Sequence, residues 1–176
     1  MEPSDAVVIG RSLDQPQAFA SIFDRHFDAV HGYARRRLGR SLAEEIASET
    51  FIRAFDGRAS FDRSRVDARP WLFGIAANLM RRHWRTERRR LNALERLQSS
   101  GAEESLTDEH ADLVMALDAL PAREREALLL YALADLSYEE IAEALGVPIG
   151  TVRSRLSRAR DRIRKRLDTV VPEGVL

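Results

Sequence analysis

Apolar residues recur every three or four positions in the first half of the chain, most clearly over the stretches 19–38 and 46–55. This spacing is typical of amphipathic helices that bury one face, and neither half shows the alternation of a strand. The predicted helices are residues 17–39, 41–56 and 70–90, with a loop at 57–69 and shorter helices in the second half. The predicted fold class is therefore all-α.

The polar stretch QSSGAEESLTDEH interrupts this periodicity in the middle of the chain. It is acidic, contains a glycine and lacks an apolar repeat, which is typical of a linker. We therefore predict two small helical domains joined by a flexible acidic linker. The predicted boundaries are 13–95 for the first domain, 96–110 for the linker and 111–168 for the second domain, with loose ends at 1–12 and 169–176.

The second domain contains the local signals of two helices joined by a tight turn. Ser137 and Glu140 form the S-x-x-E pattern of a capping box, and Gly146 suits the left-handed position that ends a helix. Pro148 is tolerated where the next helix begins. This pattern predicts a helix-turn-helix. The apolar stripe of its second helix consists of Val152, Leu156, Ala159, Ile163 and Leu167.

Charge is segregated along the chain, although the formal net charge is +0 at pH 7. Residues 81–90 hold six arginines against Glu87, and residues 151–166 carry a net charge of +7. Between them, residues 95–126 carry a net charge of −6. The two basic blocks are candidate binding sites for a polyanion, and their alternative interpretation is a pair of solvated helix faces.

Several functional classes lack support in the composition. With 0 cysteines, the chain offers no disulfide and no thiolate ligand, and its 4 histidines lack zinc-binding spacing. Glutamates on the second predicted helix have no histidine or phosphate loop beside them, so we expect no enzyme, metal or cofactor. No signal peptide or apolar run of membrane length occurs, and we expect a cytoplasmic protein without membrane insertion.

The second basic block lies on the outer face of the predicted helix-turn-helix. The first turns of such a helix meet base edges in the major groove, whereas later arginines suit phosphates. An alternative is that this helix packs on acidic residues at 139, 140 and 143. The candidate residues for binding double-stranded DNA are Thr151, Arg153, Ser154, Ser157 and Arg158.

The first basic block combines an aromatic ring, an amide and guanidinium groups on one helix face. These groups provide a stacking surface, base-edge hydrogen bonds and phosphate neutralisation, which unstacked bases require. The alternative is a core tryptophan beside a solvated arginine face. The candidate residues are Trp71, Asn78, Arg82, Arg85 and Arg89.

The helix predicted at 41–56 has an outer face with acidic residues beside an apolar one. We expect this face to bind a protein partner, because acidic residues beside an exposed Ile52 suit a protein interface. The outward residues are Glu45, Ser48, Glu49, Ile52 and Arg53.

Three segments in this order resemble one family, the extracytoplasmic-function (ECF) sigma factors of bacterial RNA polymerase. They are AEEIASETFIRAF, RPWLFGIAANLMRRHWR and the helix-turn-helix segment from LPAREREALLL to SRLSRAR. The resemblance implies a factor that directs core polymerase to promoters, promotes melting and is held inactive by an anti-sigma factor. Ser48 and Glu45 depart from the glutamine and aspartate that are common in the family.

The resemblance also implies a role for each surface. The helix carrying Glu45, Ile46, Glu49 and Arg53 would dock on the clamp helices of the polymerase largest subunit. Trp71 and Asn78, with the arginines beyond them, would bind the −10 element, and the loop at 57–69 would capture a flipped base. Arg153, Ser154, Ser157 and Arg158 would bind the −35 element as a duplex.

Two other hypotheses fit a helix-turn-helix in the second half. A repressor or activator with a sensing or dimerising first half would bind duplex DNA without polymerase. A decoy that binds an anti-sigma factor would keep the fold and lose transcription. Retention of Trp71, Asn78 and the arginine stripe favours a sigma factor over a decoy.

Overall fold

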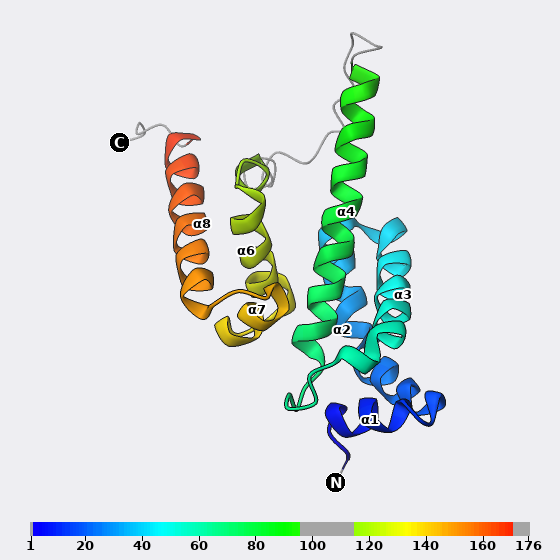
Figure 1. Ribbon diagram of the computed structural model, residues 1–176. Coiled ribbons are helices and arrows are strands. Elements are labelled where there is room, and N and C mark those ends of the chain that lie inside the picture. The colour runs from blue at the N-terminus through cyan, green and yellow to red at the C-terminus, as the bar shows by residue number, and fades with distance from the viewer. Residues whose placement is uncertain (1, 96–114, 171–176) are drawn as a thin grey trace.

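The computed structural model describes residues 2–95 and 115–170, and every regular element in these ranges is a helix (Figure 1). The prediction of an all-α fold is confirmed. The whole predicted linker, residues 96–110, and the tail after residue 170 lie outside the described residues. None of the helices in the described ranges combines the length and apolar character needed to cross a bilayer. The elements are α1 (Asp5–Ser12), η1 (Pro16–Phe19), α2 (Ala20–Leu38), α3 (Arg40–Gly57), η2 (Arg58–Ser60), α4 (Arg69–Glu95), α6 (Ala122–Ala134), α7 (Tyr138–Leu145) and α8 (Ile149–Val170).

Helices α2, α3 and α4 form the body of the N-terminal half, and α4 projects beyond the other two (Figure 1). Their apolar faces meet around Tyr33 and Phe73, whose ring centroids lie 5.3 Å apart in an edge-to-face arrangement. Gly39 separates α2 from α3 with a φ of 79°, a backbone conformation that favours glycine. The tight turn lets α3 return alongside α2 and present its own outer face.

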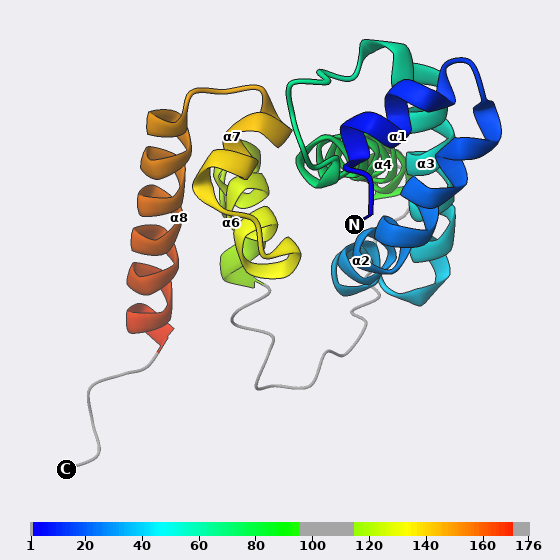
Figure 2. The same cartoon turned by 90° about the horizontal axis from the view of Figure 1, so that it is seen from below.

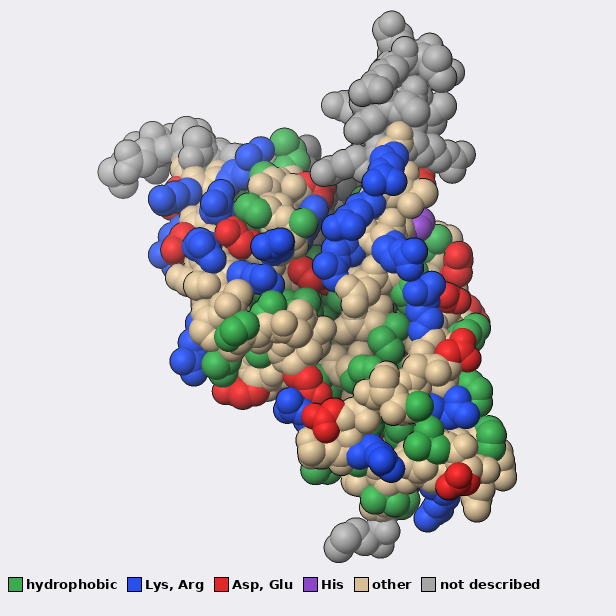
Figure 3. All heavy atoms as spheres, in the orientation of Figure 1, with side chains coloured by type: hydrophobic (Ala, Val, Ile, Leu, Met, Phe, Trp, Pro, Cys, Tyr) green, Lys and Arg blue, Asp and Glu red, His purple; other side chains and the backbone are tan. Residues whose placement is uncertain are grey.

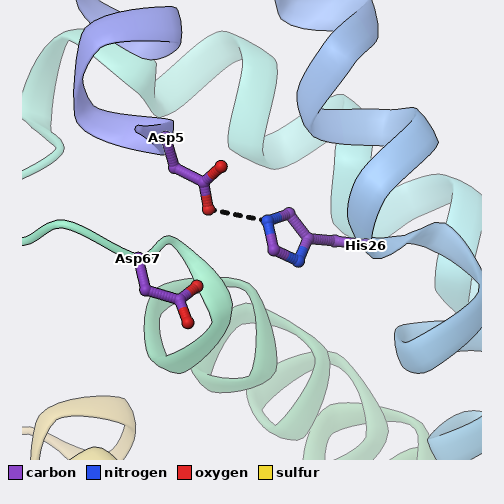
Figure 4. A group of neighbouring side chains, drawn as sticks. All are labelled: Asp5, His26 and Asp67. Atoms are coloured by element: carbon purple, nitrogen blue, oxygen red, sulfur yellow. Dashed lines mark hydrogen bonds and ion pairs between the residues drawn. The ribbon is translucent and has the colours of Figure 1, made fainter. Parts of the chain in front are cut away.

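The N-terminus was predicted to be loose, and this prediction is wrong for residues 5–12. They form α1, whose Asp5 is buried and interacts with two distant elements. Its carboxylate accepts hydrogen bonds from Arg25 and the Ala68 backbone N–H, each at 2.9 Å, and lies 2.7 Å from His26 Nε2 (Figure 4). These partners fix α1 to α2 and to the start of α4. Sequence periodicity could not reveal this anchoring because the partners lie far along the chain.

Asp67 lies near the same pair, so an Asp–His–Asp group gathers at this junction (Figure 4). Burial alone would raise the pKa of Asp5, but the hydrogen bonds from His26, Ala68 and Arg25 lower it well below its usual range. Because both Asp5 oxygens already accept hydrogen bonds, we interpret this group as a structural anchor.

Replacing Asp5 by asparagine should lower the free energy of unfolding by about 1 to 2 kcal/mol, because charge-assisted hydrogen bonds are lost. The native contribution is present above the unfolded-state pKa of about 3.9 and is lost as the pH falls toward the lower folded-state value. Urea denaturation at neutral pH and at about pH 3, below the unfolded-state pKa, should therefore show a difference that shrinks with acid. The exposed Asp14→Asn is the matched control, and equal effects of both variants would contradict the anchor.

The C-terminal half contains the predicted helix-turn-helix. Ser137 Oγ accepts from the Glu140 N–H while the Glu140 carboxylate accepts from the Ser137 N–H, which confirms the capping box. Gly146 ends α7 with a φ of 62° and confirms the predicted left-handed turn. The predicted apolar stripe of α8 is fully buried at Val152, Leu156 and Ala159 and half-buried at Ile163 and Leu167.

The two halves pack against each other, with α7 beside α4 and α6 beside α2 (Figures 1 and 2). A single apolar cluster runs from the first half into α6, α7 and α8. Helix α8 lies on the side of α6 and α7 that faces away from α4 (Figure 2). The outer face of the helix-turn-helix is therefore open while its inner face is covered.

Candidate nucleic-acid interface

A surface groove of about 520 Å³ runs between the end of α3 and the middle of α4. Spacings of seven, four and three residues place Trp71, Asn78, Arg82 and Arg85 along one side of α4, and all four line the groove. Arg89, the fifth predicted residue, is exposed farther along α4 and is not among the lining residues. The other lining residues are Arg53, Gly57, Ser60, Ile75, Leu79 and Arg81.

Trp71 is half-buried. It therefore has features of both interpretations given above, a core tryptophan and a surface for stacking bases. Its ring packs on Phe61 with centroids 5.0 Å apart, yet the side chain also lines the groove. Asn78 is exposed, and its amide oxygen accepts a hydrogen bond from Arg81. A half-exposed ring held by a buried phenylalanine is a rigid stacking surface.

Phe61 and Arg81 were not identified from the sequence as members of this site. Phe61 is buried, with 6 % of its surface exposed, and it fixes the loop before α4 against Trp71. The aromatic residue at the start of the otherwise mostly polar loop FDRSRVDA was the available signal for Phe61. Arg81 belongs to the basic block, but only the structure places it beside Asn78.

Helix α8 carries the second candidate surface on its outer face. Arg153, Ser154, Ser157 and Arg158 are exposed, and Thr151 is half-buried in the first turn. Arg158 Nε donates to the Ser154 carbonyl and Arg158 Nη2 to Ser154 Oγ, each at 3.2 Å. These bonds restrict the guanidinium to the region of the first two turns.

Two arginines of α8 form ion pairs with an acidic residue that was not predicted from the sequence to contact this helix. Glu124 of α6 is buried, and its carboxylate lies 3.0 Å from Arg162 Nε and 3.6 Å from Arg158 Nε. The alternative interpretation of the sequence was that the basic helix packs on the acidic residues 139, 140 and 143, which lie on α7. Glu143 instead pairs with Arg65, which lies outside α8.

The positive charge of the two halves gathers on both sides of the junction between them (Figure 3). Burial and the nearby guanidinium groups of Arg123, Arg158 and Arg81 lower the pKa of Arg155. Arg81 lies on α4 and Arg155 on α8, so the fields of the two basic helices overlap. A polyanion would relieve this repulsion.

The outer face of α3 is the third candidate surface. Arg53 Nε lies 2.7 Å from the Glu49 carboxylate, and both side chains are about half exposed. Glu45 is exposed on the same helix. Ile46 lies in the core with only 7 % of its surface exposed, so it supports α3 from beneath. Ile52, in contrast, is 56 % exposed and is the apolar residue that this face presents.

Fold and surfaces together define a helical protein with a helix-turn-helix, a basic aromatic groove and a separate acidic face. The family model described as Sigma-70 region 2 matches residues 22–90, and the one described as Sigma-70, region 4 matches residues 110–163. The two matches contain the groove on α4 and the helix-turn-helix, respectively.

Sequence relatives agree with these matches. The chain is 34% identical over 178 residues to the ECF RNA polymerase sigma factor SigE of Mycolicibacterium smegmatis, covering 93% of this chain and 67% of that protein. It is 32% identical over 167 residues to the ECF RNA polymerase sigma factor SigW of Bacillus subtilis, covering 85% of this chain and 89% of that protein.

Solved structures resemble the fold over most of its length. CnrH, in complex with the cytosolic domain of CnrY, is similar with a TM-score of 0.68 and 26% identity, covering 94% of this chain and 97% of that chain. The sigma factor RpoE of Bartonella quintana, in complex with the anti-sigma factor NepR, has a TM-score of 0.62 and 28% identity, covering 85% and 96%. The chain belongs to the ECF family of RNA polymerase sigma factors.

Proposed function

We propose that this sigma factor docks on core RNA polymerase through α3, binds −35 duplex DNA through α8 and captures unstacked −10 bases in the groove on α4. The observation that carries the proposal is the convergence of Trp71, Asn78, Arg82 and Arg85 on one groove. A DNA-binding repressor needs a helix-turn-helix but has no need for a stacking surface on its other half.

Base capture offers a physical route to promoter melting. Extracting a base from the stack costs a few kcal/mol, and stacking on an aromatic surface returns about 1 to 3 kcal/mol per base. Trp71 would supply the stacking surface, Asn78 a base-edge hydrogen bond, and the arginines contacts with phosphates. Opening is then driven by binding energy, without nucleotide hydrolysis.

We propose Glu45, Glu49, Ile52 and Arg53 as the docking face for the clamp helices of the largest polymerase subunit. Ile46 acts indirectly, because its side chain packs beneath this face. The partners are thus core polymerase, promoter DNA and an anti-sigma factor, the last supported by the complexes in which CnrH and RpoE were solved. The site of action is the cytoplasm, where polymerase works.

Replacing Arg158 by alanine should weaken −35 duplex binding by about 1 to 2 kcal/mol, because its guanidinium is placed to contact a base. Arg164→Ala, an exposed arginine farther along α8, is the matched control and should weaken all duplexes alike. Fluorescence anisotropy with specific and scrambled duplexes measures both. An equal loss on both duplexes would reduce Arg158 to a phosphate contact.

The proposed function is tested by co-purification with core polymerase and promoter binding with and without core. Each small domain alone should bind DNA weakly, so tight promoter binding should require core. Tight duplex binding by the free protein, with no association with core, would instead favour a repressor.

A further inference from the structure

The loop segment between α3 and α4, residues 58–68, is attached to α1 at both of its ends. At its start, Arg58 Nε donates to the Ser12 carbonyl at 3.3 Å. At its end, the N–H of the buried Ala68 donates to the Asp5 carboxylate at 2.9 Å. Asp5 and Ser12 are the first and last residues of α1, so the whole length of this helix spans the loop segment.

The middle of the loop segment also lies against α1. A Cβ atom added to Gly10 would lie 3.6 Å from Arg63 Cδ and 3.8 Å from Arg63 Nη1, so the Arg63 side chain extends over the helix at this glycine. A single methyl group fits there in ordinary van der Waals contact, whereas a larger side chain would compete with Arg63 for the space. One short helix therefore contacts the loop segment at three separate points.

The attachment at Asp5 is rigid because α2 holds this carboxylate in place. Its Oδ1 accepts a hydrogen bond from Arg25 at 2.9 Å, and its Oδ2 lies 2.7 Å from His26 Nε2 (Figure 4). The neighbouring Asp67 accepts a hydrogen bond from the Arg69 N–H at 2.8 Å, which fixes the first turn of α4. The end of the loop segment is therefore restrained by α1, α2 and α4 together.

Between its attachments the loop segment presents an exposed turn beside Trp71. The Asp62 carboxylate accepts hydrogen bonds from the Ser64 N–H at 3.0 Å and from Ser64 Oγ at 2.7 Å, which closes this turn. Phe61 packs on Trp71, and both line a groove of about 380 Å³ together with Asp62. A base that stacks on Trp71 would therefore meet the turn, which α1 supports from the other side.

We propose that α1 is a positioning element for −10 recognition, because it fixes the loop segment so that the exposed turn contacts the captured base beside Trp71. The proposal rests on the proposed function of this surface in −10 binding. Asp5 and Gly10 are positioning residues, since they act through the loop segment and are not among the residues that line the groove. A contact distinguishes one base from another only when its partner is held in place, so a loosened turn should lose base preference.

Gly10→Leu and Asp5→Ala should loosen the loop segment by independent routes. The first inserts a larger side chain at Arg63 while it favours the helical backbone of α1. The second removes the acceptor of the Ala68 N–H. Gly10→Ala is the matched control, because it favours the same helix and its methyl group leaves Arg63 in place.

Hydrogen exchange of the free full-length protein measures the restraint without DNA or polymerase. We expect amide exchange across residues 61–72 to be at least about fivefold faster in Gly10→Leu and Asp5→Ala than in the wild type. Exchange in α3 should keep its wild-type rate, and Gly10→Ala should match the wild type throughout. Unchanged exchange across residues 61–72 in both variants would overturn the proposal, as would an equal acceleration over the whole N-terminal half.

Base preference is measured by selection of single-stranded DNA of randomised sequence on the protein bound to core polymerase, followed by sequencing. We expect the preference for the best base to fall about tenfold at one position or more in Gly10→Leu and Asp5→Ala, equivalent to about 1.4 kcal/mol. Gly10→Ala should select the same sequences as the wild type. Affinity for core polymerase should be unchanged in all three variants, because α3 carries the proposed docking face.

Wild-type base preference at every position in both loosened variants would overturn the positioning role. A uniform loss of affinity with base preference retained would also overturn it, because α1 would then only stabilise the fold. Failure of the wild type itself to select any sequence would instead overturn the proposed −10 function. The wild-type selection and the variant selections therefore distinguish the two failures.

Discussion

Replacing Ile52 by aspartate is expected to lower the affinity for core polymerase at least about 30-fold, equivalent to about 2 kcal/mol. Ile52 is 56 % exposed on the acidic face of α3 and contributes little to the core of its own protein. Docking would bury the new carboxylate in an apolar contact without a partner. Surface plasmon resonance with immobilised core measures the loss.

Val66→Asp is the matched control for Ile52. Val66 is also an exposed β-branched residue, 73 % accessible, but it lies in the loop before α4 rather than on α3. Core affinity should be unchanged in this variant, and both variants should unfold at the same temperature as the wild type. An Ile52→Asp protein that binds core normally would remove α3 from the docking surface.

Replacing Trp71 by alanine is expected to reduce open-complex formation about 100-fold at saturating core. The loss combines base stacking, about 1 to 3 kcal/mol, with the packing that Trp71 and Phe61 give each other. Permanganate footprinting of the melted −10 region measures the open fraction. Association with core and binding to −35 duplex should be retained, because both use other surfaces.

Trp71→Phe separates stacking from folding. This variant keeps an aromatic face against Phe61 and should recover much of the open complex. If Trp71 were needed only for stability, its variants would lose melting temperature and activity in parallel. Normal opening by Trp71→Ala would assign −10 capture to another part of the groove.

The elements predicted most accurately are those whose causes lie within a few residues. The capping box at Ser137 and Glu140 and the left-handed turn at Gly146 are local, and the structure has both. The apolar periods of α2, α3 and α4 also predicted helices, since each helix buries one stripe. The start of the first helix differs slightly, because Pro16 begins a short 3-10 turn before α2.

Features that depend on distant partners could not be predicted from these patterns. Helix α1 is fixed by contacts of Asp5 with Arg25, His26 and Ala68, which no short window of sequence contains. The contact of Glu124 with the arginines of α8 likewise depends on how helices pack. The family resemblance predicted which surfaces bind partners, but packing determines which side chains those surfaces present.

The contacts between the two halves were the features least accessible to prediction from sequence. Arg37 of α2 and Glu126 of α6 form an ion pair although they are 89 residues apart, and each is a common surface residue type. Glycine is unfavourable within a helix, and only the close contact of Gly74 with Ala144 explains its presence in α4. Both depend on the two halves meeting.

Run-off transcription on a genomic fragment library, with core polymerase and with or without this protein, tests the central claim most directly. We predict discrete new start sites that appear only with the protein and that disappear with Ile52→Asp. A folded protein that binds core but yields no new start sites would contradict its action as a sigma factor.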